Sequence, residues 1–188
     1  MLFNEKVMCA LGRGLDLTGR LNPDGVPLAR DNMERFVLLS RRLGVQRLDV
    51  LATAAVRDAQ DGPAFVAAVE ARCGIRIRVV DGLHEARLAA AGVRAGIPDA
   101  DGITGDLGGG SLELAVTGSG PAPPVASLPI GPLRLLQDTG DVAQPRAAID
   151  AQLRTVSWLA RGRGRPFYAV GGTWRSPRSV RSSAASRR

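Results

Sequence analysis

The sequence predicts an α/β fold, in which strands and helices alternate along the chain. Short runs of branched aliphatic residues alternate with longer segments whose apolar residues recur at helical spacing. Turn residues separate these segments, with 23 glycines and 12 prolines among 188 residues. Aromatic residues make up only 4% of the chain, so we expect a core built mainly from Ala, Val, Leu and Ile.

The first half of the chain contains five predicted elements. Residues 7–12 have the pattern of a strand that runs into a loop, and apolar residues at helical spacing predict a helix over 27–43. The aliphatic run at 48–53 predicts a buried strand. A proline in the first turn and a closing glycine predict a helix over 62–74. Alternation of apolar and basic residues predicts a half-exposed strand over 75–80.

The second half contains five more. The alanine-rich segment 84–92 predicts a helix. A strand is then predicted to end at Asp106, and a second short strand follows the glycines at 112–116. After a Gly/Pro linker, residues 147–159 predict a helix. Residues 167–173 predict a strand that enters another glycine turn.

Charge and composition exclude several classes of function. The net charge is +7, but residues 175–188 carry five arginines and no acid, which leaves +2 for residues 1–174. We expect a disordered basic tail over 176–188 and no specific nucleic-acid partner. Lys6 is the only lysine, which excludes a Walker A motif. His84 is the only histidine, which excludes multi-histidine metal sites.

The location follows from what the chain lacks. No apolar run approaches the roughly 20 residues of a membrane span, and charges interrupt the start of the chain before any hydrophobic stretch forms a signal peptide. Cys9 and Cys73 are far apart and predict free thiols in a reducing compartment. We therefore expect a cytoplasmic protein without a membrane partner.

The strongest local signal is the segment from Asp106 to Glu113. Three consecutive glycines let a backbone approach a ligand closely and turn its amides toward an anion. The aspartate at the strand end can hold Mg²⁺, and Glu113 returns a second carboxylate to the same edge. The segment does not open a helix, as a dinucleotide-binding fingerprint would. A hairpin around phosphate is the device of actin-like ATPases, and this segment resembles one.

Three other segments carry weaker signals. Arg57 follows the end of the strand at 48–53 and could bind phosphate oxygens, although taken alone a surface pair with Asp58 is the better explanation. Glu85 lies in the first turn of a helix, where a carboxylate is stabilised by the helix dipole and can orient water. The glycine turn at 171–173 is weak by itself.

Taken together and in order, the segments are more specific. ATAAVRDA, GLHEARL, GDLGGGSLEL, SLPIGPLRL and YAVGGTWR closely resemble the exopolyphosphatase/guanosine pentaphosphate phosphohydrolase family, over roughly residues 3–175. The resemblance implies the actin-like ATPase, or ribonuclease H-like, fold. It also implies Mg²⁺-dependent hydrolysis of the terminal phosphoanhydride bond of polyphosphate or guanosine pentaphosphate.

The resemblance implies roles for individual residues. Glu85 matches the family's general base on the attacking water, Glu113 a second catalytic carboxylate, and Asp106 the metal-associated aspartate. The matches to phosphate-binding positions are Arg57, Gly108, Gly109, Gly110, Ser111, Gly171, Gly172 and Thr173.

The chain also departs from the family pattern. The family begins with a strand and a DxGSNxxR loop, which this chain lacks, and the resemblance stops after residue 175. The expectation is an incomplete fold, with residues 1–120 as a first actin-like domain and 125–175 as the start of a second. Because one side of the phosphate clamp would be missing, we expect weak or absent turnover.

Three alternatives stay open beside the hydrolase. One is a kinase relative with the same fold. The second is a basic polyanion- or nucleic-acid-binding fragment without catalysis, which would bind through its arginine tail, and the third is a degenerate product with no selected function. The sequence does not choose between polyphosphate and guanosine pentaphosphate, and it leaves a homodimer open.

Overall fold

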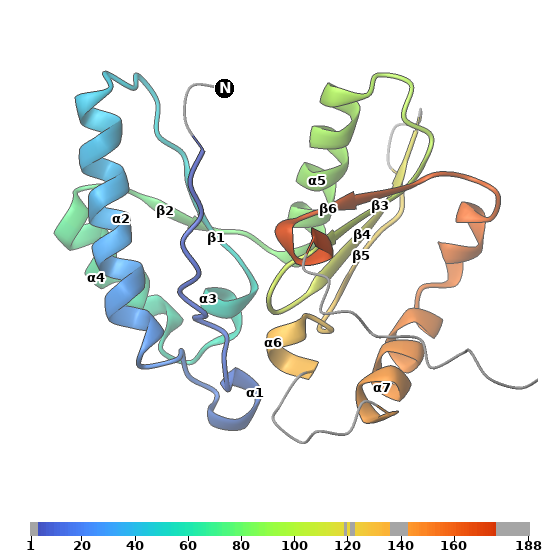
Figure 1. Cartoon of the computed structure of the whole chain (residues 1–188), viewed down its shortest axis with the longest axis horizontal. Coiled ribbons are helices and arrows are strands. Elements are labelled where there is room, and N and C mark those ends of the chain that lie inside the picture. Colours follow the sequence, from blue (N-terminus) through green and yellow to red (C-terminus); the bar gives the residue numbers. More distant parts are fainter. Residues whose placement is uncertain (1–3, 119, 121–122, 136–142, 176–188) are drawn as a thin grey trace, which may run out of the picture.

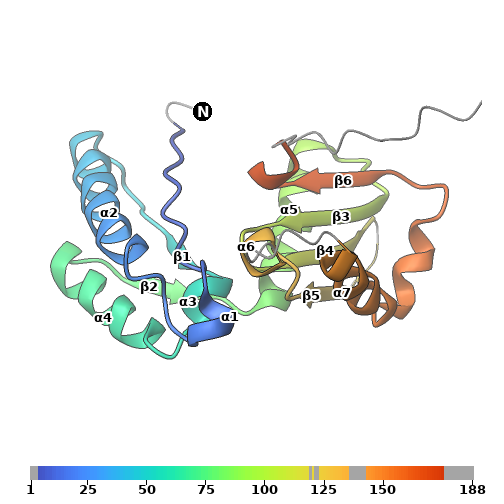
Figure 2. The same ribbon diagram turned by 60° about the horizontal axis from the view of Figure 1, so that its bottom comes forward.

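The elements fall into two groups, one from each half of the chain (Figure 1). The structure, a computed structural model, describes residues 4–118, 120, 123–135 and 143–175. Figure 2 shows the two groups side by side, with the short helices α1, α3 and α6 near the junction. Helices and strands alternate in both groups, which confirms the predicted α/β class.

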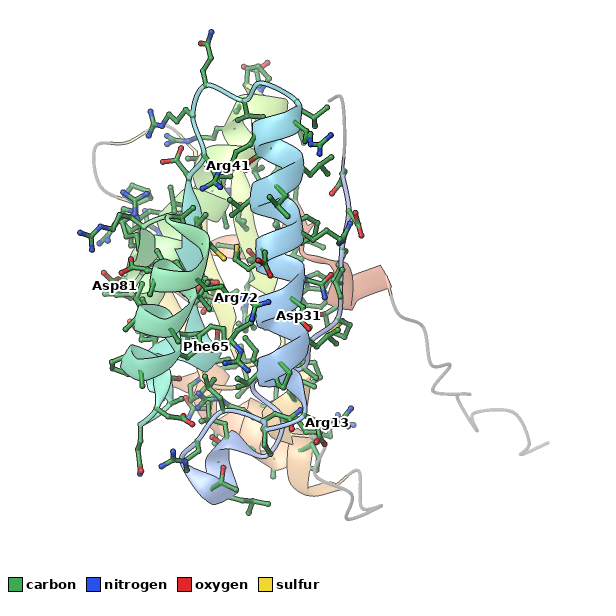
Figure 3. The ribbon with its side chains drawn as sticks, turned by 90° about the vertical axis from the view of Figure 1, so that its left-hand side faces the viewer. Arg13, Asp31, Arg41, Phe65, Arg72 and Asp81 are labelled. Carbon is green, nitrogen blue, oxygen red and sulfur yellow. The ribbon has the colours of Figure 1, made fainter. Side chains whose placement is uncertain are left out.

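The first group packs two helices against a short parallel sheet. Its elements are α1 (Leu15–Thr18), α2 (Gly25–Arg42), β1 (Val50–Ala52), α3 (Ala54–Asp58), α4 (Gly62–Cys73) and β2 (Ile77–Val79). β1 pairs with β2 in parallel, with Val50 opposite Ile77. Figure 3 shows α2 and α4 running side by side, and Arg72 of α4 joins them through Glu34 at 2.6 Å. As predicted, α4 has a proline, Pro63, in its first turn and is followed by Gly74, which has a left-handed conformation and caps the helix.

The second group is built on a four-stranded sheet in the order β5-β4-β3-β6. Its elements are α5 (Gly82–Gly96), β3 (Gly102–Leu107), β4 (Leu112–Thr117), β5 (Val125–Leu128), α6 (Pro132–Leu135), α7 (Ala143–Arg154), the 3-10 helix η1 (Ser157–Gly162), β6 (Phe167–Val170) and the 3-10 helix η2 (Gly172–Arg175). β4 is antiparallel to β3 and β5, whereas β6 is parallel to β3.

The two faces of this sheet have different chemistry. Residues of a strand point alternately to opposite faces. One face is apolar, and Ile149 and Leu153 of α7 pack on a core that includes Leu112 and Leu114. The other face carries small and polar residues and is covered by α5, whose first residue, Gly82, lies directly against β5. The polar face is therefore the part of the sheet that can hold a buried site.

Most predicted elements are confirmed, with three local corrections. The strand predicted to be buried over 48–53 is not buried, since β1 is half-buried to exposed and Leu51 is 42% exposed. The strand predicted over 7–12 is wrong, because residues 4–10 are irregular and residues 11–14 form a turn. Asn22 holds this segment instead, since its side-chain amide donates to the Ala10 carbonyl at 3.2 Å. The helix predicted over 147–159 is divided, since α7 ends at Arg154 and a 3-10 helix follows.

The predicted division of the chain at residues 120–125 runs through the sheet. β5 pairs with β4 across that boundary, and β6 returns to pair with β3. In Figure 1 the visible separation lies instead between β2 and α5. The predicted disordered tail at 176–188 lies outside the described residues. Within the described part of the chain, no helix combines the length and apolar character that crossing a membrane requires.

Candidate functional site

The site is centred on the β3–β4 hairpin. Asp106 of β3 lies directly opposite Glu113 of β4 in the register of the ladder. Residues that face each other across an antiparallel pair project from the same face of the sheet, with Cβ atoms about 5 Å apart. The two carboxylates therefore lie together, on the polar face that α5 covers.

The loop of the hairpin keeps backbone donors available. The Gly108 amide donates to the Ser111 carbonyl at 3.0 Å, and the Gly109 carbonyl accepts from the Leu133 amide at 2.9 Å. Among the described residues, the amides of Gly109 and Gly110 donate to no backbone carbonyl. Gly109 is exposed, so the hairpin is not packed shut. Adjacent unpaired amides of this kind form an anion-binding concavity.

A second glycine holds this loop from behind. An added Cβ at Gly131 would lie 2.3 Å from the Gly109 carbonyl oxygen and 2.4 Å from the Gly110 carbonyl carbon. Only glycine permits such an approach between two backbones. The segment from Gly131 to α6 therefore supports the glycine loop of the hairpin, and this role was not predicted from the sequence.

Glu85 reaches the same face from the first turn of α5. The Asp81 side chain caps this helix by accepting from the His84 amide at 2.8 Å, which fixes where the helix begins. Burial raises the pKa of Glu85 to about 7, the charges of Glu113 and Asp106 add to the rise, and Arg57 opposes it. Its Oε2 atom is buried and accepts no hydrogen bond from the described residues. Glu85 thus faces the hairpin carboxylates as an acid with a near-neutral pKa.

Glu113 is the most enclosed of the carboxylates, with 1% of its surface exposed. Its Oε1 atom accepts from the Ser127 hydroxyl at 2.8 Å, and within the described residues its buried Oε2 atom has no partner. Burial raises the pKa of Glu113, while hydrogen bonds from Ser111 and Ser127 oppose the rise. Burial also raises the pKa of Asp106. All three carboxylates are therefore costly to ionise in the absence of a compensating cation.

Arg57 provides positive charge beside them. Its Nη1 atom donates to the Val80 carbonyl at 3.1 Å and lies 3.6 Å from Glu85 Oε2. Its Nε atom donates to Asp58 at 3.0 Å. The predicted pair of Arg57 with Asp58 therefore exists. It uses only the Nε atom of Arg57, so the Nη1 atom remains beside Glu85.

The turn at residues 171–173 contacts the hairpin through Gly171, the first residue of the turn. Val170 lies opposite Asp106 in the β3–β6 pair. Gly171 has a φ of 97° and an added Cβ would lie 2.7 Å from Asp106 Oδ1, so both conformation and space require glycine. An added Cβ at Gly172 would lie 2.5 Å from the Lys6 amine. No hydrogen bond within the described chain joins Thr173 to the other site residues.

The carboxylates have the donor chemistry of a divalent-cation site that other ligands would complete. No group of three His, Cys, Asp or Glu side chains in the described ranges is close enough to hold a metal without other ligands. Mg²⁺, however, is usually held by one or two carboxylates together with waters and substrate phosphates. Asp106 and the unpartnered Oε2 of Glu113 supply hard oxygen donors of this kind, and a cation bound there would offset the cost of ionising them, which burial raises together with their pKa values.

Three residues that shape the site were not singled out from the sequence. Ser127 holds Glu113, and Gly82 lies so close to it that an added Cβ would be 2.2 Å from the Ser127 hydroxyl. Arg134 forms ion pairs with Asp58 and Asp16. Ser127 begins the segment SLPIGPLRL, which resembles the family, but no role was predicted for it from the sequence because its place beside Glu113 depends on the pairing of β5 with β4.

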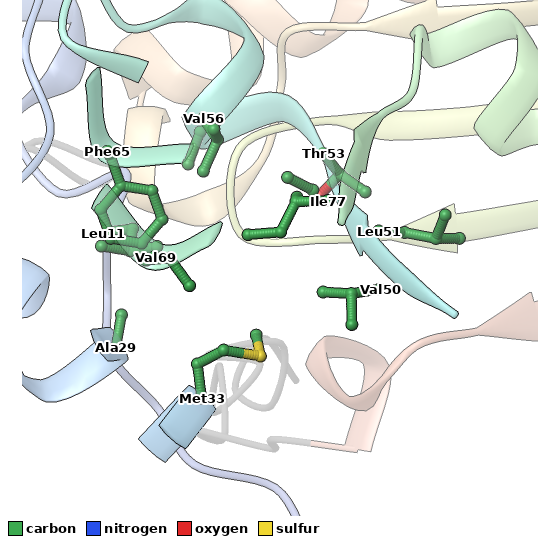
Figure 4. Close-up of a pocket in the computed structure, with 12 residues that line it drawn as sticks. Leu11, Ala29, Met33, Val50, Leu51, Thr53, Val56, Phe65, Val69 and Ile77 are labelled. Carbon is green, nitrogen blue, oxygen red and sulfur yellow. The ribbon is translucent and has the colours of Figure 1, made fainter. Parts of the chain in front are cut away.

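A separate pocket of about 220 Å³ lies in the first group (Figure 4). Its lining is mainly apolar and includes Met33, Val50 and Phe65. None of the predicted site residues lines it. It is therefore distinct from the carboxylate site.

Comparisons with known proteins identify the family of this chain. A family model described as the Ppx/GppA phosphatase family matches residues 1–174. Exopolyphosphatase 1 of Mycobacterium tuberculosis is 29% identical over 178 residues, which cover 89% of this chain and 52% of the relative. Exopolyphosphatase 2 of the same organism is 31% identical over 119 residues, covering 60% of this chain and 37% of the relative. The chain spans about half the length of the first of these relatives.

Solved structures show the same fold. The structure of an exopolyphosphatase from Cytophaga hutchinsonii matches with a TM-score of 0.78 at 24% identity, over 93% of this chain and 59% of that one. An exopolyphosphatase-like protein matches with a TM-score of 0.78 at 26% identity, over 89% and 56%. The predicted actin-like fold class is confirmed by these neighbours. With a family model matched along nearly its whole length, this chain belongs to the Ppx/GppA phosphatase family.

Proposed function

We propose that this chain carries the carboxylate side of a phosphoanhydride hydrolase site, which releases terminal phosphate from inorganic polyphosphate. The observation that carries the proposal is the convergence of Asp106, Glu113 and Glu85 on one sheet face beside a loop with unpaired amides. Relatives that bear the name exopolyphosphatase support the choice of substrate.

Binding in this proposal depends on the loop and on Arg57. The terminal phosphoryl group lies against the amides of Gly109 and Gly110, and the Arg57 guanidinium contacts its oxygens. Amides aimed at an anion and an arginine fork stabilise charge on the transferring group without reorganising during the reaction. Gly108, Ser111 and the turn at 171–173 shape the remaining walls.

Glu85 is the proposed general base. A base is most effective when its pKa lies near the working pH, and the pKa of Glu85 is about 7. Water attacks the terminal phosphorus in line with the bridging oxygen. The new P–O bond forms as the bridging P–O bond breaks, the water proton passes to Glu85 Oε2, and the shortened chain leaves as an anion.

Asp106 is the proposed ligand of Mg²⁺, with Glu113 as the second carboxylate at that edge. When bound, the ion neutralises charge on the substrate phosphates. Ser127 holds Glu113 Oε1, which leaves the buried Oε2 without a partner among the described residues. The two carboxylates would orient the substrate through the ion, whose charge would offset the cost of burying them.

The same chemistry applies to guanosine pentaphosphate, which also ends in a phosphoanhydride bond. Polyphosphate is the preferred proposal because the matched relatives carry its name. We propose that the reaction takes place in the cytoplasm, where Cys9 and Cys73, which are free in the structure, would remain reduced.

The test compares phosphate release from polyphosphate with Mg²⁺ for the unmodified chain, Glu85→Gln and the surface control Glu34→Gln. Even slow phosphate release by the unmodified chain is enough for this test, because each variant's rate is compared with the rate of the unmodified chain. We expect Glu85→Gln to lose about 100-fold or more, as for other general bases, and Glu34→Gln to keep its rate. Equal rates for the unmodified chain and Glu85→Gln would overturn the assignment of the base. No release and no binding of tripolyphosphate with Mg²⁺ would overturn the function.

A further inference from the structure

We propose that Arg134 is a positioning residue, which fixes the Arg57 guanidinium against Glu85 by holding Asp58. The inference deepens the proposed function and rests on it. Arg134 lies on α6, in the second group of elements, whereas Asp58 and Arg57 end α3 in the first group. Figure 1 shows α6 at the lower end of the sheet, on the side that faces α3.

Arg134 makes two ion pairs across the junction between the groups. Its Nη1 atom lies 3.4 Å from Asp16 Oδ1, and its Nη2 atom donates to Asp58 Oδ2. Only 13% of its side chain is exposed. A planar guanidinium with two ends can hold two carboxylates in fixed directions.

Asp58 transmits this constraint to Arg57. One carboxylate oxygen, Oδ2, accepts from Arg134, and the other, Oδ1, accepts from Arg57 Nε at 3.0 Å. Adjacent residues of a helix do not face each other, so this pair is weak without a third group to hold the aspartate. With 34% of its side chain exposed, Asp58 is free to turn to solvent once Arg134 is removed.

Arg57 is in turn the charged neighbour of the proposed base. With Nε held by Asp58, its Nη1 atom reaches the Val80 carbonyl at 3.1 Å and lies 3.6 Å from Glu85 Oε2. A chain of contacts therefore runs from Arg134 through Asp58 and Arg57 to Glu85. Loss of Arg134 therefore removes the constraint that Asp58 places on the Arg57 guanidinium.

Arg134 also lies beside the glycine loop of the β3–β4 hairpin. The amide of the preceding residue, Leu133, donates to the Gly109 carbonyl at 2.9 Å. An added Cβ at Gly110 would lie 3.7 Å from Arg134 Nε and 3.4 Å from Ala54 Cβ at the start of α3. Arg134 thus sets the loop and Arg57 at a fixed separation, across which the terminal phosphoryl group would bind.

Arg134 acts through other residues rather than on the substrate. Both of its Nη atoms are engaged by carboxylates. Its Nε atom is buried, and within the described residues it has no partner. A phosphate bound through the Nη atoms would displace one of these carboxylates, whereas a positioning residue keeps both ion pairs.

The first experiment is a double-mutant cycle on binding of tripolyphosphate with Mg²⁺, measured by calorimetry. We expect Arg134→Ala and Asp58→Asn each to weaken binding about tenfold, and the double variant to lose no more than either one. Coupling of this kind is the signature of residues that act as one unit. Losses that multiply, or full affinity in Arg134→Ala, would overturn the proposal.

The second experiment needs no ligand and therefore separates this inference from the proposed function. Solvent exchange of the Arg57 Nε–H proton is followed by NMR in the unmodified chain, Arg134→Ala, Arg134→Lys and the control Arg165→Ala. Arg165 pairs with Asp101, remote from α3. We expect exchange at least fivefold faster in both Arg134 variants, since a lysine cannot bridge two acids as a fork does, and no change in the control.

An unchanged Arg57 signal in Arg134→Lys, which keeps the charge and most of the packing, would overturn the positioning role. If the unmodified chain fails to bind tripolyphosphate while the Arg57 signal responds as expected, the proposed function fails and the positioning contact stands.

Discussion

Replacing Glu85 by glutamine should stabilise the folded chain at high pH. Burial and the neighbouring carboxylates raise the pKa of Glu85 from 4.5 to about 7. A group whose pKa is higher in the folded state binds its proton more tightly there. Its stabilising contribution is therefore fully present below pH 4.5 and is lost as the pH rises through 7. Glutamine keeps the neutral form at every pH.

The magnitude follows from the size of the pKa change. One pKa unit corresponds to about 1.4 kcal/mol, so the rise to about 7 amounts to about 3 kcal/mol. Since 19% of the Glu85 side chain is exposed and solvent screens part of the effect, we expect a gain of about 1 to 3 kcal/mol above pH 8. Below pH 4.5 the gain should fall to near zero.

The assay is urea unfolding of the unmodified chain and of Glu85→Gln between pH 4 and pH 9, followed by tryptophan fluorescence. The free energies of unfolding should diverge between pH 5 and pH 8, with the variant more stable. The control Gly92→Ala, which changes no titratable group and has open space around it, should change the free energy of unfolding by the same amount at each pH. Parallel curves for Glu85→Gln and the unmodified chain would refute the burial of a costly carboxylate at this position.

Three further predictions concern the loop, the core and the arginine. Gly131→Ala forces a Cβ to within 2.3 Å of a carbonyl oxygen and should cost more than about 2 kcal/mol in urea unfolding; Gly92→Ala, an exposed helical change with open space around it, should instead stabilise by up to about 1 kcal/mol. Leu114→Ala removes one of the largest fully buried side chains and should cost about 2 to 5 kcal/mol; a smaller loss in thermal or urea unfolding would contradict the described core. Arg57→Ala removes the cation that lowers the pKa of Glu85, so the rising acid limb of phosphate release should shift to higher pH, and an unshifted limb would argue against their contact.

Local patterns were sufficient for the elements and for the hairpin. The helix α4 was predicted from its proline and its closing glycine, both of which act within one turn of the chain. Asp106 and Glu113 were predicted to share an edge because only a short loop separates them, and the ladder places them opposite each other. The resemblance of five separated segments to one family came from the sequence as well.

What the sequence by itself determined is therefore the α/β class, the approximate strands and helices, the glycine hairpin and the family. Only the tertiary structure decided that residues 4–10 form no strand, because side-chain contacts from Asn22 replace sheet pairing there. It alone joined β5 and β6 to the hairpin, and it brought Arg134 onto Asp58, 76 residues earlier in the chain. The near-neutral pKa of Glu85 also needed the structure, because desolvation depends on which elements cover a side chain and no local pattern encodes that.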